Sequence, residues 1–343
     1  MEQYIFEKEQ YVGKIHADFL KAFSRLPLIY RLTGKTNRIY FTKETNGVKV
    51  YNSGTTLIDN YKDDSGIKAL EQWRNKLVST GVNPSEVLKT RQDYGTLLHL
   101  MYGEILSGKD FTFDKIDAQI KKRAVRELDY TPEEANKFVE SHFEEFSKDI
   151  SAFSKWLVDF KIEPVAIEQM MKSDKYLVAT AIDLVCYATV EEKGFWGEVY
   201  KSGAKKGEPK ESKKEVRKLI IVDFKSGKSK GFYPVNILQL LLNREIWEEN
   251  FPEIPLEGVY NFAPNDWRTA PTYEFYDQER ETKTTSFLDE IKENVFERGR
   301  KIFEEKLASR RELFITGDVR NPHIEFLSLE EIAEGFHEQE DRQ

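Results

Sequence analysis

The stretch LIIVDFKSGKSK, residues 219–230, constrains the fold most, because its β-branched residues predict a buried strand that ends in a glycine turn. Residues two apart in a strand share a face. Asp223 and Lys225 therefore point to one side, while Val222 and Phe224 point to the other side, into a core. A carboxylate beside an ammonium can bind a cation and steady an anion, although a solvated ion pair on a surface strand produces the same triplet.

A second apolar strand, predicted over residues 176–190, carries one acid. Asp183 is the only charged residue between Lys175 and Glu191. Burying a carboxylate in such a run costs free energy unless the group is paired or bound to a metal. A polar, glycine-containing segment joins the two runs, so we expect an antiparallel pair that brings Asp183 near Asp223. Two carboxylates at that distance repel each other and favour a divalent cation.

Upstream, DYGTLLHLMYGEIL, residues 93–106, is typical of a helix, with Asp93 as the expected N-cap. Helical spacing places Gly95, Thr96 and His99 on one face. A lone histidine on a helix is more often a packing or surface residue than a ligand. His99 is therefore a candidate ligand only in combination with the other polar residues of the motifs.

Downstream, NILQLLLNREIW, residues 236–247, predicts a mostly apolar helix with a narrow polar stripe of Asn236, Gln239 and Asn243. Such a stripe needs partners in the core or in a cleft. Glu168 lies on the strand that precedes Asp183. We expect it to face solvent at a sheet edge rather than to join the site.

Taken together, these motifs resemble the RecB-like branch of the PD-(D/E)XK nuclease superfamily over about residues 55–250. The order is a Gly-Thr-x-x-His helix, an Ala-Ile-Asp strand, the Val-Asp-Phe-Lys-Ser-Gly-Lys strand and a helix with glutamine. The segment TTLIDNY…LEQWRNKLVSTG, residues 55–81, is similar to the threonine-rich start and Trp-Arg helix of phage exonucleases and of mitochondrial genome maintenance exonucleases.

The resemblance implies a catalytic set of His99, Asp183, Asp223, Lys225 and Gln239. The histidine and the two acids would be ligands of Mg²⁺ or Mn²⁺, and the lysine would act on the attacking water or the transition state.

The same resemblance implies DNA contacts by Thr96, Lys228, Lys230 and Asn243, although the family has a tyrosine where this chain has Asn243. The family also has a glutamate soon after the helical histidine. Glu104 lies five residues beyond that histidine, off its face, and we leave it out of the site.

The implied fold is α/β with a PD-(D/E)XK, restriction-endonuclease-like core: a mixed central sheet flanked by helices, with an N-terminal helical and hairpin extension. Residues 1–160 would form the N-terminal helical region, with the β-hairpin and the Gly-Thr-x-x-His helix. Residues 161–343 would form the core sheet and the C-terminal helices, and the two parts would make one compact unit.

The implied function is metal-dependent exonucleolytic hydrolysis of DNA phosphodiester bonds, with a preference for single-stranded ends, in replication, recombination or repair. Three alternatives remain open. The chain could be an endonuclease, or a catalytically inactive nuclease fold kept for DNA binding or assembly, or Asp183 and Lys225 could form a structural buried ion pair.

Periodicity and turn signals predict the remaining elements. Asn46-Gly47 is a strong hairpin turn between alternating apolar residues. We expect helices at 8–25, 66–80, 94–107, 114–126, 132–159, 234–250 and 286–307, and strands at 38–52 (a hairpin), 164–171, 176–190, 218–225 and 256–263. The helix at 234–250 would cross between the last two strands.

Composition limits the choices. The one cysteine, Cys186, excludes an intramolecular disulfide framework and a four-cysteine iron–sulfur cluster. The net charge of −8 argues against an extended DNA-coating surface. Basic residues nevertheless gather at 201–218 and 225–231, on either side of the second motif strand. A flexible solvated loop explains the first group at least as well as a DNA clamp does.

No stretch of the chain reaches membrane-spanning length without charges, and MEQYIFEKEQ at the N-terminus has no signal-peptide pattern. We therefore expect a cytoplasmic, intracellular enzyme without a membrane partner. The similarity to phage exonucleases is compatible with a phage origin. DNA is the expected partner, and the sequence names no protein partner.

Overall fold

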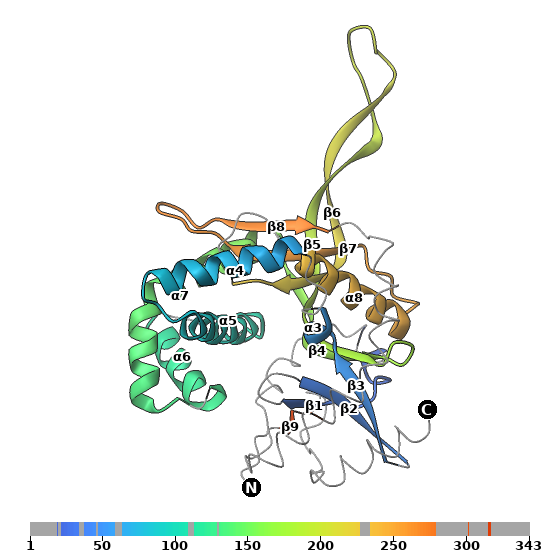
Figure 1. Ribbon diagram of the computed structural model, residues 1–343. Coiled ribbons are helices and arrows are strands. Elements are labelled where there is room, and N and C mark those ends of the chain that lie inside the picture. The colour runs from blue at the N-terminus through green and yellow to red at the C-terminus, as the bar shows by residue number, and fades with distance from the viewer. Residues whose placement is uncertain are drawn as a thin grey trace.

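One mixed β-sheet flanked by helices forms the framework of the computed structural model (Figure 1). The structure describes residues 19, 22–33, 38–45, 47–58, 64–108, 113–128, 130–226, 234–278, 301 and 315–316. Within these residues the strand order is β8-β7-β6-β5-β3-β2-β1-β9, and β4 pairs with β5 off this path. The prediction of an α/β fold with a mixed, helix-flanked central sheet is confirmed.

The strands are β1 Tyr30–Thr33, β2 Arg38–Glu44, β3 Gly47–Ser53, β4 Glu163–Ser173, β5 Val178–Val199, β6 Pro209–Phe224, β7 Gly258–Pro264, β8 Tyr273–Asp277 and β9 Ile315–Thr316. The described helices are α3 Gly54–Ile58, α4 Asp64–Ser79, α5 Pro84–Leu106, α6 Phe113–Glu127, α7 Pro132–Asp159 and α8 Pro234–Asn250. β6 and β7 are parallel and are joined by α8, as expected, and β3 is parallel to β5. The other strand pairs are antiparallel.

The predicted hairpin at residues 38–52 is confirmed as β2 and β3, which pair from Ile39 opposite Asn52 to Glu44 opposite Gly47. The end of β3 then pairs with the start of β5. The N-terminal hairpin and the strands beyond residue 160 therefore belong to one continuous sheet.

Local signals fix the start of α7. Thr131 and Glu134 form a reciprocal capping box, and a proline occupies the first turn. The helix accordingly spans the predicted residues 132–159.

Helix α5 begins ten residues before the predicted start. Its N-cap is Asn83, whose side chain accepts a hydrogen bond from the Ser85 backbone N–H. The expectation that Asp93 caps this helix is wrong, because Asp93 lies within it and contacts Lys89 and the Tyr130 hydroxyl. The stronger cap upstream, followed by proline, extends the helix past this local signal.

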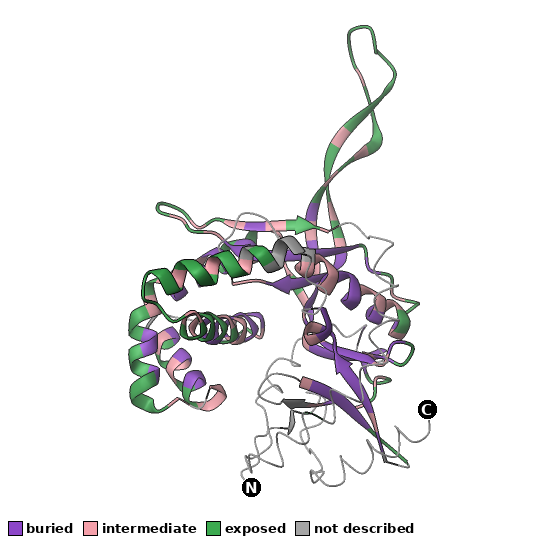
Figure 2. Ribbon diagram, viewed as in Figure 1, coloured by how far each residue is buried: buried purple, intermediate pink, exposed green. Residues whose placement is uncertain are grey.

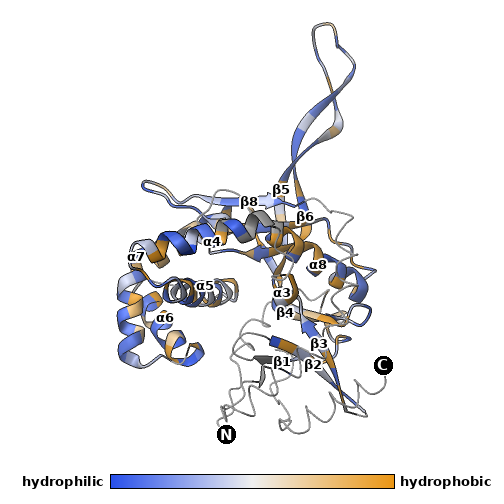
Figure 3. Cartoon of the chain, viewed as in Figure 1, coloured by the Kyte–Doolittle hydropathy of each residue, from blue (hydrophilic) through white to orange (hydrophobic). Residues whose placement is uncertain are grey.

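The sheet is buried on both faces. On one face Phe224 and Phe262 pack with aromatic residues of α5 and α7, among them Tyr102 and Trp156. On the other face Ile221 packs in a cluster with apolar residues of α8. Figures 2 and 3 show buried, apolar residues along the sheet strands and α8. The predicted burial of the Val222 and Phe224 side is confirmed, and the Asp223 side is covered as well.

The two motif strands, β5 and β6, extend further into the segment that connects them than we expected. We predicted strands ending at residue 190 and starting at residue 218, joined by a polar segment. Instead β5 continues to Val199 and β6 starts at Pro209, so most of the connection is a paired ribbon that projects from the sheet (Figure 1). We call residues 193–214 the β5–β6 arm.

Two predicted helices lie largely outside the described residues. From the helix predicted at 8–25 the structure describes only residue 19 and residues 22–25, of which Phe19, Ala22 and Phe23 are helical and buried. From the helix predicted at 286–307 it describes Lys301 alone, which is helical. Among the described residues, no helix combines the length and apolarity needed to cross a membrane.

Candidate metal centre

Four polar side chains lie in one row across four neighbouring strands. Strand β5 pairs with β4 and β6 so that Glu168, Asp183 and Asp223 come opposite one another: Ile167 faces Leu184, Leu184 faces Val222, and the acids are one residue further along each ladder. Asp223 in turn faces Asn261 on β7. The strands are largely apolar here, so the row collects polar side chains from four mostly buried strands.

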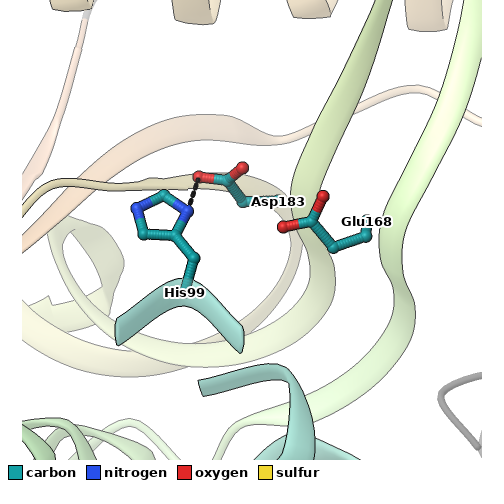
Figure 4. A group of neighbouring side chains, drawn as sticks. All are labelled: His99, Glu168 and Asp183. Carbon is teal, nitrogen blue, oxygen red and sulfur yellow. Dashed lines mark ion pairs between the residues drawn. The ribbon is translucent and has the colours of Figure 1, made fainter. Parts of the chain in front are cut away.

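His99, Glu168 and Asp183 form a cluster in which one potential ligand atom from each lies within 4.8 Å of the others. The His99 Nδ1 is 3.6 Å from an oxygen of Asp183. Figure 4 shows the Glu168 carboxylate directed toward Asp183 and His99. Helix α5 supplies the histidine, and β4 and β5 supply the acids.

The expectation that Glu168 faces solvent is wrong. Among the described residues its strand pairs with β5 alone, as expected for a sheet edge, but its carboxylate turns toward Asp183 and His99. Its backbone has a φ of 50°, a left-handed conformation that is uncommon for non-glycine residues. Such backbone strain costs about 1–3 kcal/mol and clusters at functional sites.

Asp183 is held where its negative charge is unfavourable. Burial raises the pKa of its carboxyl well above the ordinary value, and the charges of Asp223 and Glu168 raise it further. One compensating contact is the Phe224 backbone N–H, which donates to an Asp183 oxygen at 2.7 Å. An added cation would relieve this repulsion.

The approach of α5 to the end of β6 places the histidine. The His99 ring packs edge-on against Phe224, with ring centroids 5.8 Å apart. One turn earlier, a Cβ on Gly95 would lie 2.9 Å from the Ser226 hydroxyl oxygen. Glycine therefore permits this close approach. Burial lowers the pKa of His99, which favours the neutral imidazole that a metal requires.

Asp223 lies beside the cluster in a network of its own. It is 2% exposed, and one of its oxygens accepts from Lys225 at 2.7 Å and from the Asn261 amide at 2.9 Å. The Lys225 ammonium also donates to Gln239 of α8 at 2.9 Å. The structure thus brings Lys225, Asp223 and Gln239 together as predicted. Asn261 was missed, although a lone asparagine in an apolar strand is the same signal that singled out Asp183.

The predicted ligand set differs from the observed cluster in one member. Glu168, not Asp223, is grouped with His99 and Asp183. The structural alternative also changes, because Lys225 pairs with Asp223 of its own strand. Asp223 remains close enough to raise the pKa of Asp183, so the two predicted acids do lie side by side.

The donor set suits a hard divalent cation. An octahedral ion with bonds of about 2.1 Å holds its ligands roughly 3–4 Å apart, which the 4.8 Å limit of the cluster allows. Two carboxylates and one imidazole fit Mg²⁺ or, because of the histidine, Mn²⁺. Glu168 has no hydrogen-bond or ion-pair partner among the described residues, so its oxygens are available.

The residues expected to contact DNA have different surroundings. Thr96 is exposed on α5, and its hydroxyl donates to the Gln92 carbonyl. Asn243 is 1% exposed, which argues against direct contact with a polymer in solvent. Lys228 and Lys230 lie outside the described residues.

Glu104 lies away from the metal ligands, as expected. It is buried and accepts two hydrogen bonds from the Arg123 guanidinium. Comparison with models of known protein families and with the sequences of curated proteins gave no match.

Proposed function

We propose that the protein is a metal-dependent DNA exonuclease that hydrolyses phosphodiester bonds. The observation that carries this proposal is the convergence of His99, Glu168 and Asp183, with the Asp223–Lys225 pair beside them. Three acids from three neighbouring strands, gathered near one histidine, are expensive to keep together without a cation. An adjacent, positioned ammonium is what phosphoryl-transfer chemistry adds to such a cation site.

His99, Glu168 and Asp183 would hold the ion, and Asp223 adds negative charge next to them. A bound divalent cation polarises a phosphoryl oxygen and lowers the pKa of a water molecule. Lys225 is kept in place by Asp223 and Gln239, so its ammonium is oriented before substrate arrives. It orients the attacking water or offsets the charge that develops on the phosphate.

The choice of DNA, and of cleavage from ends, rests on the sequence resemblance to RecB-like exonucleases. The same resemblance supports a preference for single-stranded ends. Three carboxylates in the site would repel a polyphosphate, so substrate binding at the site should itself depend on the cation. The activity would serve DNA replication, recombination or repair.

The direct test uses end-labelled linear DNA, single- and double-stranded, incubated with Mg²⁺, Mn²⁺ or EDTA. We expect stepwise loss of nucleotides from single-stranded ends with either metal and none with EDTA. A circular single strand of the same sequence should survive. Equal degradation of circle and line would indicate an endonuclease.

A matched pair of variants excludes a contaminating nuclease. Asp183→Asn should abolish cleavage, whereas Asp174→Asn, an acid in the turn after β4 that pairs with Lys49 and Lys172, should cleave at the parental rate. DNA binding by a parent protein that cuts with neither metal would leave the inactive binding module as the better reading.

A further inference from the structure

The β5–β6 arm is a two-stranded ribbon that no other strand of the described residues joins. Strand β5 pairs with β4 no further than Tyr187, and β6 pairs with β7 no earlier than Ile220. Among the described residues, the strand segments of the arm pair only with each other, and Figure 2 shows the arm projecting from the body with mostly exposed residues. An isolated two-stranded hairpin is marginal in water, so a projecting one is expected to serve a contact.

The charge of the arm is opposite to that of the rest of the chain. Residues 193–214 contain seven lysines and three glutamates, a net charge of +4 in a chain whose net charge is −8. The other residues therefore carry −12. Lys193, Lys201 and Lys206 make no ion pair within the described structure. Such a local excess of lysine suits a polyanion.

Aromatic rings are interleaved with these lysines. Phe195 is 71% exposed and Trp196 is 39% exposed, and as neighbours in a strand they lie on opposite faces. The Trp196 indole lies against Gly194, where an added Cβ would be 3.3 Å from the ring, and the Lys214 ammonium is 5.3 Å from the ring centroid. The Trp196 ring therefore packs against the backbone at Gly194, and the Lys214 ammonium lies near the ring.

We infer that the arm binds a single strand of DNA, with its lysines on the phosphates and Trp196 and Phe195 stacked on bases. Positively charged elements with interleaved aromatic residues bind single strands in this way, because every base offers a ring face. A continuous apolar surface would favour a protein partner instead. Here the exposed apolar side chains are divided between two faces and separated by charges.

The arm extends the strands that carry the metal-site acids. From Asp183 to Phe195 is twelve residues, about 40 Å along an extended strand. That length corresponds to roughly 12 nucleotides of a stacked strand. The arm therefore holds DNA at a distance from the cleaved bond. This inference rests on the proposed function for the identity of the polymer, but its own readout is binding.

The charge is tested with Lys201→Gln, Lys205→Gln and Lys206→Gln combined, and the probe is a 30-nucleotide oligothymidylate in Ca²⁺. Loss of three phosphate contacts should lower the slope of log affinity against log salt by about 2, so that between 50 and 200 mM salt the parent loses about 20-fold more affinity than the variant. The control removes three exposed lysines from helices, Lys76, Lys115 and Lys137, and should keep the parental slope.

The stacking is tested by fluorescence. Bases stacked on Trp196 should quench its emission, and Trp196→Phe should remove that quenching while the other four tryptophans stay unchanged. Phe195→Ser with Trp196→Ser should weaken binding of the 30-mer about 5-fold or more. A six-nucleotide probe is too short to occupy the metal site and the arm together, so the gain in affinity from six to 30 nucleotides should be smaller in the arm variants than in the parent.

The outcomes separate this inference from the proposed function. Cleavage by the parent, with unchanged 30-mer affinity and salt slope in both arm variants, would overturn the arm inference alone. If the parent is a dimer and an arm variant is a monomer that still binds DNA, the partner of the arm is a second copy of this chain and not DNA. DNA binding that depends on the arm, without cleavage by the parent, would support the arm inference and overturn the proposed exonuclease function.

Discussion

Helix α5 contributes to two groups of charged side chains that differ in whether their acidic and basic charges cancel. Glu104 meets Arg123 at 2.7 Å, and Arg123 also contacts Glu127, which lies 3.9 Å from Arg126. These two acids and two arginines cancel. The charges of this group are balanced by the chain itself.

One turn earlier on the same helix, His99 joins a group that does not cancel. Among the described residues, Glu168, Asp183 and Asp223 lie together with one ammonium, that of Lys225, which pairs with Asp223, and burial favours the neutral form of the histidine. A buried acid is therefore not in itself a functional signal. The excess of acids over cations among the described residues is what supports the proposal of a cation site in this group.

The largest expected effect is on the balanced group. Arg123→Met removes both cationic contacts of the buried Glu104 carboxylate and should lower the free energy of unfolding by about 3–5 kcal/mol. Urea denaturation measures this loss, and Mn²⁺ affinity of the folded protein should not change. Adding Glu104→Leu to the same chain should recover most of the stability, because an apolar pair leaves no buried charge.

Lys225→Ala tests whether the group around His99 takes part in cleavage. Its ammonium is positioned for the reaction, so the cleavage rate should fall about 100-fold, or about 2.7 kcal/mol in the barrier. DNA affinity in Ca²⁺ should stay within a few-fold of the parent. Lys89→Ala is the matched control, because Lys89 contacts Asp93 at the same 2.7 Å on the surface of α5. Parental cleavage by Lys225→Ala would remove lysine from the mechanism.

Asp183→Asn should act in the opposite direction to Arg123→Met. Burial, Asp223 and Glu168 raise the folded-state pKa of Asp183 above its unfolded value of about 3.9, so its ionisation costs stability as pH rises between the two. In EDTA at pH 8 the variant should gain about 1 kcal/mol or more, and at pH 4 it should gain little. Mn²⁺ affinity, measured by calorimetry, should fall at least tenfold. A loss of stability at pH 8 would mean that the acids are not in conflict.

Asp174→Asn is the control for Asp183→Asn, because the pKa of Asp174 is lowered whereas that of Asp183 is raised. Burial alone would raise the pKa of Asp174, but hydrogen bonds from Lys172, Lys49 and Tyr51 outweigh it and lower the pKa to about 2. Its stabilisation is therefore present above pH 4 and lost as pH falls toward 2. The variant should be slightly less stable at neutral pH and should bind Mn²⁺ like the parent.

The smallest expected effect concerns the close approach of α5 to β6. Gly95→Ala places a Cβ 2.9 Å from the Ser226 hydroxyl, while alanine favours the helix by about 1 kcal/mol. Stability should therefore hold or rise slightly, and cleavage should fall a few-fold as His99 shifts. Adding Ser226→Ala should restore the rate. Equal rates in all three variants would show that this contact does not position the histidine.

Local patterns in the sequence predict the parts of the site whose contacts lie close together along the chain. Apolar, β-branched runs around Asp183 and Asp223 predict two buried strands, and the intervening segment predicts their antiparallel pairing, which the structure confirms. The crossover helix with Gln239 and the capped helix α7 also follow from nearby residues. Such signals are reliable because their partners lie within a few positions along the chain.

Tertiary structure decided what depends on register and on burial. Glu168 and Asn261 are polar residues in largely apolar strands, and only the pairing of four strands shows that they share a row with Asp183. The arm escaped prediction because alternation reports a buried face, and a ribbon with both faces in solvent has none. Whether a buried acid is paired or left in excess is likewise set by residues distant in sequence, because charge balance is a property of the packed group.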